Sequence, residues 1–152
     1  MSTDSSTAVG VAVSKQSISS AGVRHVLHAA QDRAVELGLV VSVAVVDEGG
    51  VLMGFIRLDG ASIGSVDVAI DKAYTVVSTG FGAATGDLFN FVKDDASLVV
   101  GLAARGRNAF IGGGSPITVD GVLIGAVGVA GGHYSDDIKV AEAAAAGIAA
   151  MS

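Results

Sequence analysis

The strongest constraint on the fold is a pair of short turn sequences, each acidic or glycine-containing and each set between two apolar runs. They are Asp47–Gly50, between the runs 39–46 and 51–58, and Asp120–Gly121, between the runs 117–119 and 122–130. Turns of this composition join antiparallel strands into hairpins. Helical patterns lie before, between and after the hairpins, with no strand–helix–strand alternation. The sequence therefore predicts an α+β fold built on an antiparallel sheet.

Apolar residues at helical spacing predict three longer helices around these hairpins. They cover about Ser20–Leu37, Ile63–Ser78 and Ser135–Ala150. Ser19 or Ser20 suits the N-cap of the first helix, and Gly38 suits its end. Ser135 suits the N-cap of the third helix, whose positive end favours Asp136 and Asp137.

The second predicted helix carries an apolar stripe that we expect to be buried. Its members are Val66, Ala69, Ile70, Ala73 and Val77. On this spacing Lys72 lies on a flank of the helix, on the same side as Ser65. Between 81 and 107 the patterns are weaker and predict a short helix near 85–91. Residues 96–104 suit either a short strand or a short helix.

Composition limits the size of the protein and the classes of partner. A chain of 152 residues, 51% of them hydrophobic, fits one domain with a sizeable core. We expect residues 1–18 to form a polar tail, in which Val11–Val13 could pair with a sheet edge, and residues 19–152 to form a single domain. The net charge of −6 and the lack of a Lys/Arg cluster exclude nucleic acid and anionic membranes as expected partners.

Several kinds of chemistry and location are also excluded or disfavoured. The chain has no cysteine, so disulfides, thiolate catalysis and zinc–thiolate sites are ruled out. The first residues lack the pattern of a secretory signal, and no segment reaches the roughly 18 apolar residues that span a bilayer. We therefore expect a cytoplasmic protein.

The triplet Gly112, Gly113 and Gly114, followed by Ser115, is the leading ligand-binding candidate. Consecutive glycines can present backbone N–H groups to a carboxylate without a Cβ in the way. The alternative is a tight corner or bulge between strands. The triplet opens no strand–helix unit and is not followed by Gly-Lys-Ser/Thr, so it is not a phosphate-binding loop of that type.

Lys72 is the candidate for an ion pair with a ligand carboxylate, or for a base if it is desolvated. Ser65, seven positions earlier, could line the same pocket. The alternative is a surface lysine on a half-exposed helix. Asp47, Arg57 and Asp59 flank the first hairpin and suit either an ion-pair network that fixes its geometry or part of an active site.

His25 and His28 are the candidates for ligands to a haem iron or another metal. Residues three apart share a helix face, so the two imidazoles could act together. Their neighbours on that face are polar, which favours a solvated surface as the alternative. His133 precedes the last helix and is a further possible ligand.

Four motifs, in this order, resemble the signatures of the GlcG/HbpS family. They are Val45–Leu52 with Arg57–Ala61, Ser65 with Lys72, Ala73 and Thr75, Gly112–Pro116, and Gly125–Val129 with Gly131, Gly132, Asp136 and Asp137. The resemblance extends over about residues 20–150. It implies a profilin-like or PAS-like fold, with about five antiparallel strands flanked by helices, and homo-oligomers. Members of the family include haem-binding and haem-degrading proteins and the C-terminal domain of PduO-type corrinoid adenosyltransferases.

Three functional hypotheses follow. The first is a small-molecule binding protein of the GlcG/HbpS type, with haem or a related tetrapyrrole as its ligand. The second is a cofactor-independent catabolic enzyme, a lyase, isomerase or hydrolase, acting on a small carboxylated substrate near Lys72 and Gly112–Gly114. The third is an assembly partner without chemistry, in which the small residues of 141–150 pack against another subunit.

Overall fold

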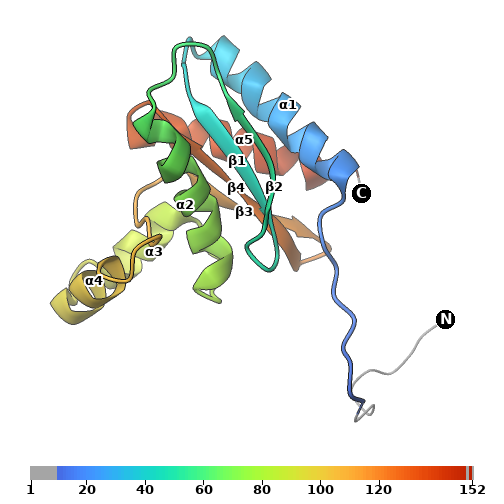
Figure 1. Ribbon diagram of the computed structural model, residues 1–152, viewed down its shortest axis with the longest axis vertical. Coiled ribbons are helices and arrows are strands. Elements are labelled where there is room, and N and C mark those ends of the chain that lie inside the picture. The colour runs from blue at the N-terminus through green and yellow to red at the C-terminus, as the bar shows by residue number, and fades with distance from the viewer. Residues whose placement is uncertain (1–9, 150, 152) are drawn as a thin grey trace.

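The computed structural model describes residues 10–149 and 151, which form five helices and one sheet (Figure 1). The elements are α1 Ser20–Glu36, β1 Ser42–Asp47, β2 Leu52–Arg57, α2 Gly64–Ser78, α3 Thr85–Val92, α4 Ala96–Ala103, β3 Gly114–Val119, β4 Val122–Ala130 and α5 Tyr134–Ala149. All neighbouring strands are antiparallel, in the order β2-β1-β4-β3. The predicted α+β class and antiparallel sheet are confirmed.

The sheet has four strands in the described residues rather than about five. The segment Val11–Val13 joins no strand, and the side chains of Val11 and Val13 are exposed. Figure 1 shows this segment leaving the body of the protein below α1. Half of the predicted tail, residues 1–9, lies outside the described residues.

The residues of each turn fix the geometry of both hairpins. In the first, Asp47 Oδ1 accepts the N–H groups of Gly49 at 2.9 Å and Val51 at 3.0 Å. These bonds support the structural interpretation of Asp47, and Arg57 forms no ion pair with it in the described part of the chain. In the second hairpin, Asp120 and Gly121 have φ values of 51° and 77°, as a tight hairpin turn requires.

The sheet is covered on both faces. Helices α1 and α5 pack with the sheet around the larger apolar cluster, which includes Val26, Val43, Val127 and Val140. Helix α2 covers the other face, where Ala44, Ala69, Ala73 and Ala126 are among the core residues. As its nearly unbroken apolar sequence predicts, β1 is central and buried, although it begins at Ser42 rather than at Leu39.

The helix ends agree with the sequence at α1 and differ at α5. Ser19 Oγ accepts the Gly22 N–H at 3.0 Å, so Ser19 is the N-cap of α1, and Gly38 follows the helix with φ 66°. At α5 the predicted N-cap, Ser135, lies within the first turn. Its N–H donates to His133 Nδ1 at 3.2 Å, so the imidazole supplies the capping acceptor.

The buried stripe of α2 is rotated relative to the predicted one. Its fully buried residues are Ser65, Ala69, Lys72, Ala73, Thr75 and Val76, whereas Val66, Ile70 and Val77 are half-buried. The polar members are tolerated because each has partners: the hydroxyls of Ser65 and Ser42, for example, lie 2.8 Å apart. Within residues 10–149 no helix is long and apolar enough to cross a membrane.

Candidate functional site

Lys72 is buried and forms an ion pair with Asp137 across the gap between α2 and α5. Each side chain is 2% exposed, and Nζ lies 3.0 Å from Asp137 Oδ2. Nζ also donates to the Val129 carbonyl oxygen at 2.8 Å. The other carboxylate oxygen of Asp137 accepts the Gly132 N–H at 3.0 Å. Lys72 is therefore not the surface lysine that the sequence left as an alternative.

Burial acts on the pKa values of both members of this pair. Desolvation lowers the pKa of Lys72, and the negative charge of Asp137 opposes that shift. Desolvation likewise raises the pKa of Asp137, against the stabilising charge and hydrogen bond of Lys72. For both groups desolvation is the larger cause, so burial moves each pKa toward the neutral form and the charge of the partner offsets part of that shift.

The glycine triplet makes room for this lysine. A Cβ on Gly113 would lie 2.7 Å from Lys72 Nζ and 2.5 Å from the Val129 carbonyl oxygen, and φ at Gly113 is 129°. Gly114 is equally crowded, since its Cβ would lie 2.7 Å from the Lys72 carbonyl oxygen. The Gly114 N–H donates inward, to Thr85 Oγ1 at 2.9 Å. At Gly113 and Gly114 the backbone is therefore packed closely against its own protein, as in the alternative of a tight corner between strands.

Lys72 and Asp137 form part of the wall of a hollow of about 480 Å³. We call it the lysine hollow. Its lining includes Ser65, Lys72, Gly131, His133, Tyr134 and Asp137. It brings Ser65 and Lys72 together, as the sequence predicted.

A second hollow, of about 660 Å³, adjoins the first and shares Ile111 and Tyr134 with it. We call it the aromatic hollow. Its lining includes Phe89, Phe110, Gly112, Tyr134 and Ile138. Gly112 is the member of the triplet that reaches a hollow. Ser115 instead lies buried in β3 opposite Val127 and lines neither of the two hollows.

The three histidines lie in different environments. His25 and His28 are exposed on α1 and line neither hollow, whereas His133 lines the lysine hollow. Its Nδ1 is engaged by Ser135, through Oγ at 2.8 Å and the N–H at 3.2 Å. No hydrogen bond within residues 10–149 occupies its Nε2. In the same residues no group of three or more acidic or histidine side chains is placed to hold a metal.

Neither the partner of Lys72 nor the aromatic residues of the aromatic hollow were predicted from the sequence. Asp137 was interpreted through the dipole of α5, and Phe89 lies in a region of weak pattern. The sequence did contain one signal for the Lys72–Asp137 contact, the dipeptide Gly131-Gly132. These glycines form the tight connection from β4 into α5, next to Asp137.

Comparison with known proteins shows the family to which the chain belongs. Residues 18–146 match the family profile described as haem degrading protein HbpS-like. The chain is 35% identical over 128 residues to an uncharacterized 15.0 kDa protein from the dhaT-dhaS intergenic region of Citrobacter freundii, a match covering 84% of this chain and 89% of that protein. It is also 35% identical over 130 residues to the corrinoid adenosyltransferase PduO of Salmonella typhimurium. That match covers 82% of this chain but 38% of PduO.

Solved structures show the same fold. The protein ORFY of Klebsiella pneumoniae superposes with a TM-score of 0.87 at 28% identity, over 96% of this chain and 100% of ORFY. The PduOC:heme complex superposes with a TM-score of 0.79 at 32% identity, over 87% of this chain and 95% of that chain.

Proposed function

We propose that this chain, which belongs to the HbpS-like family, is a small-molecule binding protein whose ligand is haem or a related tetrapyrrole. The observation that carries the proposal is the likeness to the PduOC:heme complex, at 32% identity over 87% of the chain. The two adjoining hollows supply a place for such a ligand, because each lies within the range of roughly 300–1,000 Å³ typical of small-molecule sites.

The chemistry of the two hollows fits a tetrapyrrole. The aromatic hollow offers Phe89, Phe110 and Ile138 to an apolar ring. The lysine hollow offers polar groups to carboxylates. Two of the three Nζ protons of Lys72 have acceptors in the described residues, which leaves one for a ligand oxygen.

His133 is the residue that we propose as a ligand to a haem iron. Its Nε2 forms no hydrogen bond in the described residues, and ligation through Nε2 requires the tautomer with the proton on Nδ1. In that tautomer Nδ1–H donates to Ser135 Oγ at 2.8 Å, in place of accepting the Ser135 N–H, and orients the ring as a supporting partner does for a metal-bound histidine. Haem, when bound, would supply ligand-binding and redox chemistry at its iron. The protein's part is to orient the ring through the aromatic side chains and to hold its carboxylates near Lys72.

Haemin titration followed by the Soret band tests the proposal. We expect a saturable Soret shift with the wild-type chain and a weaker, altered spectrum with His133→Ala. The paired variant His25→Ala/His28→Ala is the matched comparison and should bind as the wild type does. No Soret shift in the wild type would contradict haem binding. If the Soret shift were lost in the paired variant but kept in His133→Ala, the iron ligand would instead be His25 or His28 on α1.

A second function, a cofactor-independent enzyme acting on a carboxylated substrate, is favoured by one specific observation. The Lys72–Asp137 pair is buried at the wall of the lysine hollow beside Ser65, where a desolvated lysine can move a proton. Screening the purified chain against small carboxylated intermediates tests this function. Turnover that survives Lys72→Met undiminished would remove Lys72 from the reaction.

We also propose that the protein acts as a homo-oligomer. Helix α4 is apolar, yet none of its residues is buried, and Val100 is 67% exposed. Phe81, which precedes α3, and Phe91, within α3, are 67% and 70% exposed, with ring centroids 5.7 Å apart. An apolar surface of this kind on a globular protein is typical of a contact between subunits.

A further inference from the structure

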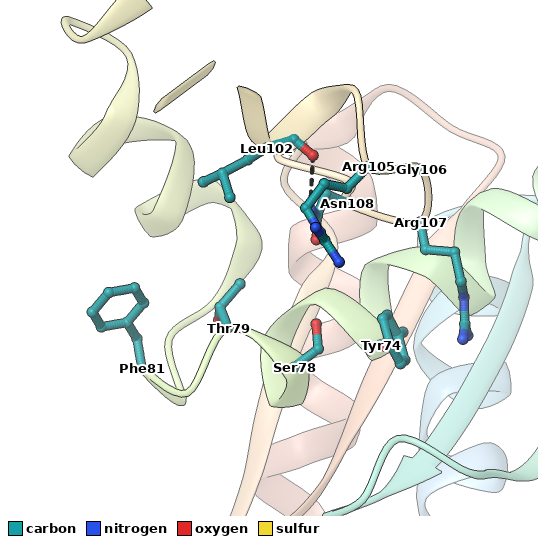
Figure 2. Close-up of a pocket in the computed structure, with 9 residues that line it drawn as sticks. All are labelled: Tyr74, Ser78, Thr79, Phe81, Leu102, Arg105, Gly106, Arg107 and Asn108. Atoms are coloured by element: carbon teal, nitrogen blue, oxygen red, sulfur yellow. Dashed lines mark hydrogen bonds between the residues drawn. The ribbon is translucent and has the colours of Figure 1, made fainter. Parts of the chain in front are cut away.

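A third hollow, of about 410 Å³, lies between the end of α2 and the loop that follows α4 (Figure 2). Its lining includes Tyr74, Ser78, Phe81, Leu102, Arg105 and Arg107. We call it the arginine hollow. It shares no lining residue with the lysine or aromatic hollows, so an inference about it does not depend on the proposed haem site.

Two guanidinium groups give the arginine hollow its charge. Arg107 lies with its Cζ 3.6 Å from the centre of the Tyr74 ring, and its Nε is 3.6 Å from Asp71 Oδ1. The guanidinium of Arg105 has no hydrogen bond or ion pair with any residue in the described part of the chain, although its backbone N–H donates to the Leu102 carbonyl oxygen at 3.3 Å. Figure 2 shows its guanidinium directed from the loop toward the end of α2. In a chain of net charge −6, this group is an unpaired cation at a formed hollow.

The loop that carries both arginines is held in a disfavoured conformation. Gly106 and Arg107 have φ values of 69° and 55°. The left-handed region costs a non-glycine residue about 1–2 kcal/mol, and such strain concentrates at ligand-binding and catalytic sites. Interactions from α2 maintain it: the buried Thr75 hydroxyl accepts the Ala109 N–H at 2.8 Å and lies 3.0 Å from the Arg107 carbonyl oxygen.

Asn108 adds a second support to the loop. Its Nδ2 donates to the Leu102 carbonyl oxygen at 2.7 Å, which ties the loop to the end of α4 (Figure 2). The two guanidiniums are therefore presented by a braced segment rather than by a free one. Pre-organisation of this kind reduces the entropy that a ligand must remove on binding.

The remaining lining of the arginine hollow is partly apolar. Phe81, Leu102 and Tyr74 give it ring and aliphatic surface, and Ser78 adds a hydroxyl. A planar guanidinium matches a carboxylate through two parallel hydrogen bonds, and aromatic faces match a flat ring. From this combination we propose that the arginine hollow binds a small aromatic carboxylate, with Arg105 contacting the carboxylate.

Chemical-shift titration of the full ¹⁵N-labelled chain with benzoate tests the proposal. We expect saturable shifts at the Gly106 and Asn108 amides, with acetate binding more weakly because it has no ring. Arg105→Gln should weaken benzoate binding by about tenfold or more, the loss expected for one charged hydrogen-bond pair. Arg24→Gln, a change at an exposed residue of α1, is the matched control and should leave the binding unchanged.

Four results would overturn the proposal. The first is an absence of saturable shifts at the amides of the arginine hollow. The second is benzoate binding that is equal in Arg105→Gln and in the wild type. The third is inorganic phosphate or acetate binding as tightly as benzoate, which would leave the apolar lining without a role. A benzoate response confined to Gly131 and Gly132 would place the ligand in the lysine hollow and would also contradict the proposal.

Discussion

Lys72 and Asp137 are the charged side chains that the fold buries within residues 10–149. Placing an isolated charge in the protein interior costs several kcal/mol, so each of these residues depends on the other. Their contact spans 65 positions of sequence. It also fixes the geometry around the lysine hollow, because Asp137 accepts the Gly132 N–H and Lys72 donates to the carbonyl oxygen of Val129.

Removing one partner of this pair should be strongly destabilising. We expect Lys72→Met to lower the free energy of unfolding by about 3–5 kcal/mol, because it leaves the Asp137 carboxylate buried and unpaired. The double variant Lys72→Met/Asp137→Leu should recover much of that loss. Urea unfolding followed by circular dichroism measures both changes. Arg33→Met, which breaks the exposed pair with Glu36, is the control and should cost about 0–1 kcal/mol.

The same burial predicts a pH dependence of stability. Desolvation, opposed by Asp137, places the folded-state pKa of Lys72 below the unfolded value of 10.5. Between those two values the unfolded chain binds a proton that the folded chain lacks. The contribution of Lys72 to the free energy of unfolding should therefore rise as the pH rises through that window. Urea unfolding of the wild type and of Lys72→Met across this range measures the difference. A difference that falls with rising pH would contradict the lowered pKa.

At the scale of elements, glycine on β4 sets how closely α2 approaches the sheet. A Cβ on Gly128 would lie 2.0 Å from the Ala69 carbonyl oxygen and 2.6 Å from the Ala73 nitrogen, both backbone atoms of α2. Alanine residues on α2 complete the close contact. Lys72 can extend toward Val129 and Asp137 because this separation is short.

Gly128→Ala should therefore push α2 away from the sheet. We expect a loss of about 3 kcal/mol or more in the free energy of unfolding, at the upper end of overpacking costs. Gly101→Ala in α4 is the matched control, because its added Cβ meets nothing within 4 Å. As a change within a helix, it should stabilise the protein by up to about 1 kcal/mol. Equal effects of the two variants in thermal or urea unfolding would contradict the role assigned to Gly128.

At the scale of the whole molecule, the α3–α4 pair projects from the body of the protein (Figure 1). Its exposed apolar side chains motivate the proposed homo-oligomer. Native mass spectrometry should show an assembly of the wild-type chain, and the paired variant Phe91→Glu/Val100→Glu should shift it to smaller species by placing charge in the contact. Val35→Glu, on the exposed side of α1, is the control. A monomeric wild type at micromolar concentration would contradict the proposal.

The sequence by itself determined the parts of the fold that depend on neighbouring residues. Asp47 and the Asp120-Gly121 dipeptide specify their hairpins through their own turn chemistry, and Ser19 caps the helix that directly follows it. The apolar run that became β1 already required cover on both faces. These features are local, so their physical causes can be found within a few positions of the chain.

Only the tertiary structure decided what the candidate site residues do. The spacing within α2 placed Lys72 on a flank, but burial depends on which faces of distant elements meet, and β4 and α5 enclose it. The absence of side chains at Gly112–Gly114 likewise leaves a space, and the sequence does not show whether a ligand or a side chain of the protein itself fills it. At Gly113 the lysine fills that space. The pairing of Lys72 with Asp137 follows from packing, which no local pattern encodes.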